Sequence, residues 1–136
     1  MREILFRGKR KDNGEWVKGY YLYISEGEGA YDYEQHFIKT EYKGRFGPCY
    51  EVIPETVGQY TGLTDDKNGR KIFEGDIVTA HFKNNGHRTT FKVDVMDGMF
   101  IFNNGFAKVN FWDIYCLKII GNIHDNPKLM KGGGQE

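Results

Sequence analysis

Short runs in which hydrophobic and polar residues alternate make up most of this chain, and small polar turn pairs separate them. Alternation with a period of two is typical of a β-strand, because successive side chains point to opposite sides. The turn pairs are Asn-Gly or Asp-Gly, at residues 13–14, 68–69, 85–86, 97–98 and 104–105. Such pairs favour the positive φ angles of two-residue type I′ turns. The pattern therefore predicts an all-β protein built of hairpins.

The first hairpin is predicted around Asn13-Gly14. A two-residue turn there would pair Lys9 with Lys18 across the two strands. One side of this hairpin would then carry cations and aromatic rings together, namely Arg7, Lys9, Lys11, Trp16, Lys18 and Tyr20. The other side, which contains Phe6 and Tyr21, is the expected core side.

The turn at Asn85-Gly86 predicts a second hairpin, which would pair His81 with Thr90. One side of it is mostly apolar and contains Val78, Ala80, Phe82, Thr89, Phe91, Val93 and Val95. The opposite side is polar and contains Thr79, His81, Lys83, Arg88, Thr90 and Lys92. Pairing about Asp97-Gly98 adds Phe100 and Phe102 to the apolar side. We therefore expect a three-stranded meander over residues 77–102, with the apolar side in the core.

Three segments lack this clear alternation. Residues 25–35 contain acids and glycines without a basic residue, which predicts a solvated loop. Residues 109–120 fit either a short helical turn that leads into a strand or one long strand, and we favour a strand over 116–123 only. The glycine-rich end is expected to be mobile. The resulting division is an N-terminal β-hairpin region over 1–54, a β unit over 57–125 and a tail over 126–136.

Length, charge and cysteine content narrow the class of protein. A chain of 136 residues can bury a core without disulfides or metal. Its 19 Lys and Arg balance 19 Asp and Glu, so a nucleic acid would have to bind a local patch. Cys49 and Cys116 are too few for a disulfide framework, so we expect free thiols in a reducing compartment. Without an apolar run of signal-peptide or membrane-spanning length, the sequence predicts a cytoplasmic protein with no membrane partner.

Enzyme chemistry cannot be assembled from these residues. The stretch 68–72 lacks the glycine spacing and the hydroxyl of a phosphate-binding loop, and Lys67 stands where a calcium loop needs an oxygen ligand. The histidines have no partners at metal-ligand spacing, and Ser25 lies outside a Gly-x-Ser-x-Gly turn. We therefore expect no catalytic residue, no metal and no cofactor, and a function that is not enzymatic.

The centre of the chain carries a distinctive motif. Its residues are Gln59, Tyr60, Thr61, Gly62, Asp65, Asn68, Gly69, Glu74, Gly75 and Asp76. Together with residues 2–8, 16–20 and 119–127, this motif resembles the YopX-like family of temperate phage and prophage proteins. The resemblance covers nearly the whole chain. It implies a phage-encoded accessory protein of the bacterial host cytoplasm, of unknown biochemical activity, whose main unit is an SH3-like small barrel or roll.

The same motif also has a structural interpretation. Its glycines suit backbone conformations that are closed to other residues, and Asp65 and Asn68 can hydrogen-bond to turn amides. Residues 74–76 would then form the entry to a strand. A recognition site built on the acids is the alternative, and the sequence leaves both open.

Two functions are compatible with these features. The first is a protein-interaction module that binds a protein partner or forms a homo-oligomer, because small β-barrels expose strand edges and loops. The second is a nucleic-acid-binding protein that uses the basic and aromatic side of the first hairpin, since cations follow phosphates and rings stack on bases. The side with Lys83, Arg88 and Lys92 is a further candidate for nucleic acid, without an aromatic residue of its own.

Overall fold

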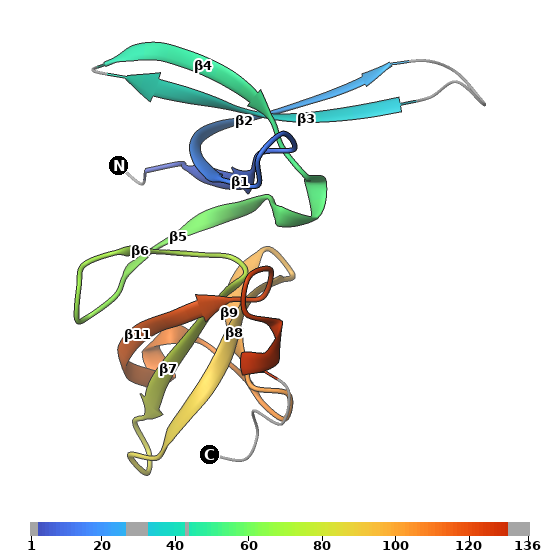
Figure 1. Ribbon diagram of the computed structural model, residues 1–136. Helices are drawn as coiled ribbons and strands as arrows, with labels where there is room; N and C mark the ends of the chain where they lie inside the picture. The colour runs from blue at the N-terminus through green and yellow to red at the C-terminus, as the bar shows by residue number, and fades with distance from the viewer. Residues whose placement is uncertain (1–2, 27–32, 43, 131–136) are drawn as a thin grey trace. The chain divides into compact units, whose positions relative to one another are not determined.

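The computed structural model describes residues 3–26, 33–42 and 44–130 and forms two compact units, residues 1–60 and 61–136 (Figure 1). The sequence predicted its main division between residues 54 and 57, whereas the units meet between Tyr60 and Thr61, inside a strand. The helices of the described segments are short 3-10 turns, and none has the length and apolar character needed to cross a bilayer.

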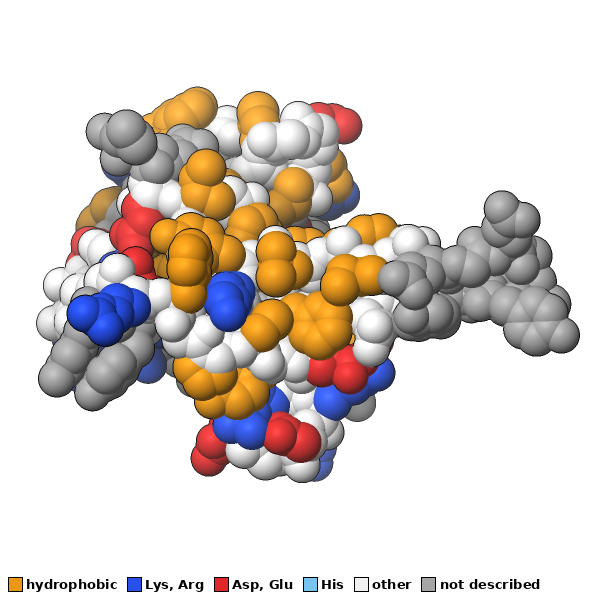
Figure 2. Space-filling model, turned by 90° about the horizontal axis from the view of Figure 1, so that it is seen from above, with side chains coloured by type: hydrophobic (Ala, Val, Ile, Leu, Met, Phe, Trp, Pro, Cys, Tyr) orange, Lys and Arg blue, Asp and Glu red, His pale blue; other side chains and the backbone are white. Residues whose placement is uncertain are grey.

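The first unit is an antiparallel sheet. Its strands are β1 (Phe6–Lys9), β2 (Trp16–Glu26), β3 (Tyr33–Tyr42) and β4 (Arg45–Glu51), and the 3-10 turn η2 (Pro54–Thr56) leads to β5 (Gly58–Thr64). The strand order of this sheet is β4-β3-β2-β1-β5-β6, with β6 (Lys71–Phe73) at its edge, and β5 pairs with β1 through Gly58 and Gln59. Ile38 and Val52 are fully buried on its inner side. Hydrophobic side chains also gather at the surface of this unit, in a band along the long β2–β3 hairpin (Figure 2).

Close approach of β2 and β3 depends on one glycine. A Cβ atom on Gly19 would lie 2.1 Å from the carbonyl oxygen of Lys39, a separation that no side chain tolerates. Glycine at this position therefore lets the two strands pair from Tyr20 with Lys39 to Glu26 with Tyr33.

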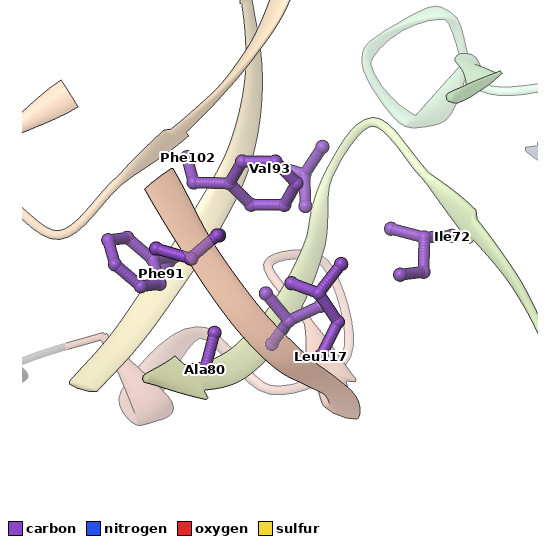
Figure 3. Close-up of a cluster of buried hydrophobic side chains, with 8 residues drawn as sticks. Ile72, Ala80, Phe91, Val93, Phe102 and Leu117 are labelled. Atoms are coloured by element: carbon purple, nitrogen blue, oxygen red, sulfur yellow. The ribbon is translucent and has the colours of Figure 1, made fainter. Parts of the chain in front are cut away.

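The second unit contains a five-stranded antiparallel sheet of order β10-β9-β8-β7-β11. Its elements are β6 (Lys71–Phe73), β7 (Asp76–Phe82), β8 (Arg88–Met96), β9 (Met99–Asn103), β10 (Lys108–Val109), η3 (Phe111–Asp113), β11 (Ile114–Asn122) and η4 (Pro127–Leu129). One core cluster fills its inner side, and Figure 3 shows these side chains turned toward one another. The cluster consists of Ile72, Val78, Ala80, Phe91, Val93, Phe102, Ile114 and Leu117.

The predicted all-β class is confirmed, and so is the meander β7–β8–β9. Both sheets are open, and the described strands do not close into a barrel, so the SH3-like form is not confirmed. The predicted core is largely correct. Val95 and Phe100 are exceptions, because neither belongs to the cluster: Val95 is 45% exposed and Phe100 is half-buried.

The register predicted at Asn13-Gly14 and Asn85-Gly86 is wrong by two residues. Lys9 pairs with Trp16 instead of Lys18, and His81 pairs with Arg88 instead of Thr90. The reason is the turn type. In the second loop the N–H of Phe82 donates to the carbonyl of His87 at 3.0 Å, which encloses four residues. A slip of two keeps every side chain on its predicted side, because the strand repeats every two residues.

A shared geometry explains these four-residue loops. The N–H of Gly14 donates to the carbonyl of Arg10 at 2.9 Å, and the Gly69 N–H donates to Asp65 in the same way at 2.9 Å. The glycine alone has a positive φ, +74° at Gly14. Among the described residues none of the four Asn-Gly pairs is a type I′ turn, because their asparagines lack the positive φ that this turn requires.

The Asp97-Gly98 turn is confirmed as a two-residue turn. Its φ angles are +53° and +77°, as a type I′ turn demands, and Met96 pairs with Met99 across it. The predicted pairs of Val95 with Phe100 and Val93 with Phe102 are therefore present.

The irregular segments differ in part from their predictions. The two ends of the predicted 25–35 loop belong to strands β2 and β3, because the pairing between these strands outweighs the acidic composition of the segment. Residues 27–32 of the predicted loop lie outside the described residues. Over 109–116 the helical turn η3 leads into a strand, which begins at Ile114 instead of Cys116. Of the predicted tail, residues 126–130 are described and contain η4, and 131–136 lie outside the described residues.

The core assignment predicts the effect of removing one ring. Phe91 is fully buried, and its ring centroid lies 5.6 Å from that of Phe82 and 6.2 Å from that of Phe102. Phe91→Ala should lower the free energy of unfolding by about 3–5 kcal/mol, measured by urea denaturation. The matched control is Phe106→Ala, since Phe106 is 85% exposed and its loss should change stability by less than about 0.5 kcal/mol. Equal stability of the two variants would contradict this core.

Candidate functional site

The cations and rings predicted on the first hairpin do share one side of it. Strands β1 and β2 pair Lys9 with Trp16 and Arg7 with Lys18, and Tyr20 follows on the same side of β2. Arg7 is buried at 9% exposure, and its guanidinium carbon lies 4.6 Å from the centre of the Trp16 ring. The Lys9 ammonium lies 5.5 Å from the same ring. These cation–π contacts compete with any base that would stack on Trp16.

Lys11 does not belong to this side, contrary to the sequence prediction. It lies in the four-residue loop between Arg10 and Glu15, because the first strand ends two residues earlier than predicted. Its ammonium is 3.2 Å from a carboxylate oxygen of Glu51, and its N–H donates to the Glu51 carbonyl at 3.0 Å. Lys11 therefore ties the loop to the end of β4.

The side of β2 that carries Tyr20 continues as an exposed hydrophobic surface. Leu22 and Ile24 follow Tyr20 at alternate positions, and Phe46 from β4 places its ring centroid 6.4 Å from that of Tyr20. These four side chains, which we call the apolar face, are 48%, 43%, 40% and 77% exposed for Tyr20, Leu22, Ile24 and Phe46. Figure 2 shows how hydrophobic side chains gather along this hairpin.

Charged residues border the apolar face with both signs. Lys39, opposite Tyr20, has its ammonium 5.8 Å from the Phe46 ring centroid. Glu41 pairs with Phe46 on β4. Glu3, Ile4, Leu5, Lys18, Gly19, Tyr20 and Glu41 line an open depression of about 520 Å³ next to the face. The apolar face thus has a polar rim of mixed charge, as protein interfaces do.

The inner side of the same sheet is occupied by its own packing. The Tyr21 hydroxyl hydrogen-bonds to Nδ1 of His36, and Nε2 of His36 lies 3.6 Å from a carboxylate oxygen of Glu34. Burial raises the pKa of Tyr21, with smaller contributions from Tyr23 and Glu34, so its hydroxyl is not activated as a nucleophile. Tyr23 packs against His36 on this side, with ring centroids 5.0 Å apart, although Tyr23 itself is 50% exposed.

In the central motif, Asp65 is a buried carboxylate that organises backbone. One of its oxygens accepts the N–H groups of Lys67 and Asn68 at 2.6 and 2.9 Å, which shapes the turn as the sequence predicted. The other accepts the N–H of Ile119 at 2.6 Å, a contact with β11 that the sequence does not signal. Its neighbour Asp66 accepts the N–H of Leu117 at 2.8 Å.

Other motif residues also bond to the chain's own backbone. The Thr61 hydroxyl donates to the carbonyl of Ile72 at 2.8 Å, and Asp76 accepts the N–H of Phe73 at 2.8 Å. Gly75 has a φ of +94°, and its N–H donates to Val93 at 2.9 Å. These contacts supply the turns and strand entries of the second unit.

The described part of the chain contains no cluster of potential metal ligands, and its two cysteines are not joined in a disulfide. Over residues 3–26, 33–42 and 44–130, His, Cys, Asp and Glu side chains do not gather in threes as metal ligands would. Cys49 is exposed and Cys116 half-buried, and both are free thiols.

The sequence predicts some residues of the apolar face but not Phe46. The sequence placed Tyr20 on this side of the first hairpin, and the alternation of β2, continued beyond Tyr20, leads to Leu22 and Ile24. Phe46 could not be found in this way, because the pairing of β3 with β4 contains an irregularity between Lys39 and Glu41 that shifts the register.

The geometry thus defines a two-unit all-β protein with an exposed apolar face on its first sheet. The family described as YopX protein matches residues 5–131, nearly the whole chain, and the chain belongs to that family. No curated protein and no solved structure matches it.

The contacts of Asp65 predict a pH-dependent stability. Burial raises the pKa of this carboxyl, but the N–H donors of Ile119, Asn68 and Lys67, with the Arg70 cation, outweigh it and leave the pKa below its ordinary value. The contribution of the carboxylate is therefore full above the unfolded pKa of about 3.9 and is lost as the pH falls through the lower folded value. Asp65→Asn should destabilise the protein by about 1–3 kcal/mol at neutral pH.

This destabilisation should shrink below about pH 4, when urea denaturation of both proteins is followed from neutral to acid pH. The control is Asp97→Asn, because Asp97 is exposed and asparagine also tolerates its positive φ. If Asp65→Asn is no less stable than Asp97→Asn at any pH, Asp65 does not anchor β11.

Proposed function

We propose that this protein is a non-enzymatic phage accessory protein of the bacterial cytoplasm that works by binding protein, with a second copy of itself as the partner of its apolar face. The observation that carries the proposal is the group of four large hydrophobic side chains left at the surface of one sheet. Contiguous exposed hydrophobic patches rimmed by polar residues mark interaction sites in soluble proteins. The match to the YopX family does not specify an activity, so the proposed binding function is argued from the exposed side chains.

The arrangement of the face suits self-association. Tyr20, Leu22 and Ile24 form a row with Leu22 at its centre, spaced by the strand repeat. A two-fold axis through Leu22 would place Tyr20 of each copy over Ile24 of the other. A two-fold interface uses the same patch twice, so one apolar row is sufficient to build it.

Charge favours the same partner. The chain has a formal net charge of +0, so two copies meet without long-range repulsion. Lys39 and Glu41 stand on the rim with opposite signs, so neither sign dominates the edge of the apolar face.

Replacing Leu22 tests this interface. Leu22→Asp places a charge at the centre of the row, where its desolvation would cost several kcal/mol, and should convert dimer to monomer. The measurement is the molar mass by light scattering after size exclusion, over a range of protein concentrations. Because Leu22 is 43% exposed, the variant should keep the circular-dichroism melt of the wild type.

Phe106→Asp is the control for this experiment. It adds the same charge at an exposed phenylalanine of the second unit and should leave the dimer intact. A wild-type protein that stays monomeric at every concentration would refute self-association, and so would a Leu22→Asp variant that keeps the dimer mass.

A further inference from the structure

A second group of exposed side chains lies on the second unit and shares no residue with the apolar face. Phe111, Trp112 and Tyr115 are 45%, 59% and 45% exposed, close together in sequence at η3 and the start of β11. The ring centroids of Phe111 and Trp112 lie 5.0 Å apart in an edge-on arrangement. The three rings line an open depression of about 420 Å³ together with Lys83 and Asp66. Aromatic rings exposed in this way are available for stacking on a planar group of a ligand.

Strand pairing brings cations to these rings. Strand β11 pairs with β7 so that Tyr115 lies opposite His81, and their rings stack with centroids 5.3 Å apart. The N–H of Lys83 donates to the Asp113 carbonyl at 3.0 Å, which joins the end of the β7–β8 hairpin to η3. Arg88, opposite His81, is exposed on the same side of the sheet. The polar side of this hairpin therefore gains the aromatic residues that its own sequence lacks.

An irregularity in β11 adds a third cation. Tyr115 pairs with His81 and Lys118 with Thr79, although three positions separate the first pair from the second along β11. In a regular strand Tyr115 and Lys118 would point to opposite sides, and the bulge puts both on the side of His81. Cys116 within the bulge has a φ of +61°, which is uncommon for a residue other than glycine. Backbone strain of this kind concentrates at functional sites.

Two carboxylates also border the surface and belong to its charge balance. Asp66 accepts the N–H of Leu117 with one oxygen, and Asp113 lies in η3 between Trp112 and the strand. Against them stand Lys83, Arg88 and Lys118, all exposed. The excess of cations and the exposed rings are the two elements that single-stranded nucleic acids require, since cations neutralise phosphates and rings stack on bases of any sequence.

We propose that this surface, made of Phe111, Trp112 and Tyr115 with Lys83, Arg88 and Lys118, binds single-stranded nucleic acid. An unpaired base stacks on the exposed rings, and the phosphates on either side of it lie against the lysine and arginine side chains. DNA and RNA share this chemistry, so the experiment contains both. The proposal rests on the second unit and does not depend on self-association through the apolar face.

The test is a fluorescence-anisotropy titration of the full chain with labelled single-stranded DNA, single-stranded RNA and duplex DNA at a series of salt concentrations. The wild type should bind at least one single strand more tightly than the duplex. Trp112→Ala should weaken binding about tenfold, within the range for loss of one stacked base, and leave the salt dependence unchanged. The double variant Lys83→Ala with Lys118→Ala should reduce the slope of log affinity against log salt by about 1.4, because two phosphate contacts are lost.

Matched variants elsewhere in the second unit make the test specific. Phe106→Ala removes an exposed ring and Lys108→Ala an exposed cation, and both should bind as the wild type does. Trp16→Ala probes the rival surface on the first hairpin. Circular-dichroism melts accompany each variant, and Trp112→Tyr should restore most of the affinity because it keeps a stacking ring.

Three results would overturn the proposal. The first is no change in anisotropy with either single strand at low salt. The second is loss of binding in Trp16→Ala with full binding in Trp112→Ala, which would place the site on the first hairpin. The third is equal weakening by Phe106→Ala and Trp112→Ala, which would mean that the contact is not localised.

Discussion

The carboxylates of Asp65 and Asp66 bind the backbone of β11 at Ile119 and Leu117, residues 54 and 51 positions further along the chain. Much of the second unit depends on these two contacts. They hold β11 so that Ile114 and Leu117 complete the core cluster, and they satisfy N–H groups at the point where the strand is irregular. A strand with a bulge gives up regular ladder hydrogen bonds, and two adjacent acids in a tight loop replace them.

The two units differ in where they expose hydrophobic and aromatic side chains. The first sheet buries few large side chains, among them Ile38 and Val52, and leaves one row of hydrophobic residues along β2 at the surface. The second unit has a continuous core and exposes three neighbouring rings where η3 meets β11, whereas the exposed ring of Phe106 lies in the loop between β9 and β10. A surface that binds apolar residues and a surface that holds rings next to cations can thus coexist in one chain without sharing residues, and each can be altered separately.

Local patterns predicted much of this architecture, and long-range contacts account for what they missed. Alternation assigned the core side of β7 and β8 correctly, and Asp97-Gly98 formed the two-residue turn that it predicts. Alternation did not predict that the opposite side is also buried at Thr79 and Thr90. The pairing of β3 with β4 and the position of η3 beside Lys83 depend on residues far apart in sequence, which alternation cannot detect. The site shows the same limit. The cations of the β7–β8 hairpin were visible in the sequence, whereas Phe111, Trp112 and Tyr115 reach them only through β11.

The four-residue loops at Gly14 and Gly86 have a consequence for how such hairpins can change. The predicted two-residue loops and the observed four-residue loops assign every strand residue to the same side, because they differ by an even number. Insertions or deletions of two residues at these loops would therefore preserve both the core and the surface chemistry of the strands. A single-residue change cannot be absorbed by such a shift of register, so the loop itself has to take it up as a three- or five-residue connection.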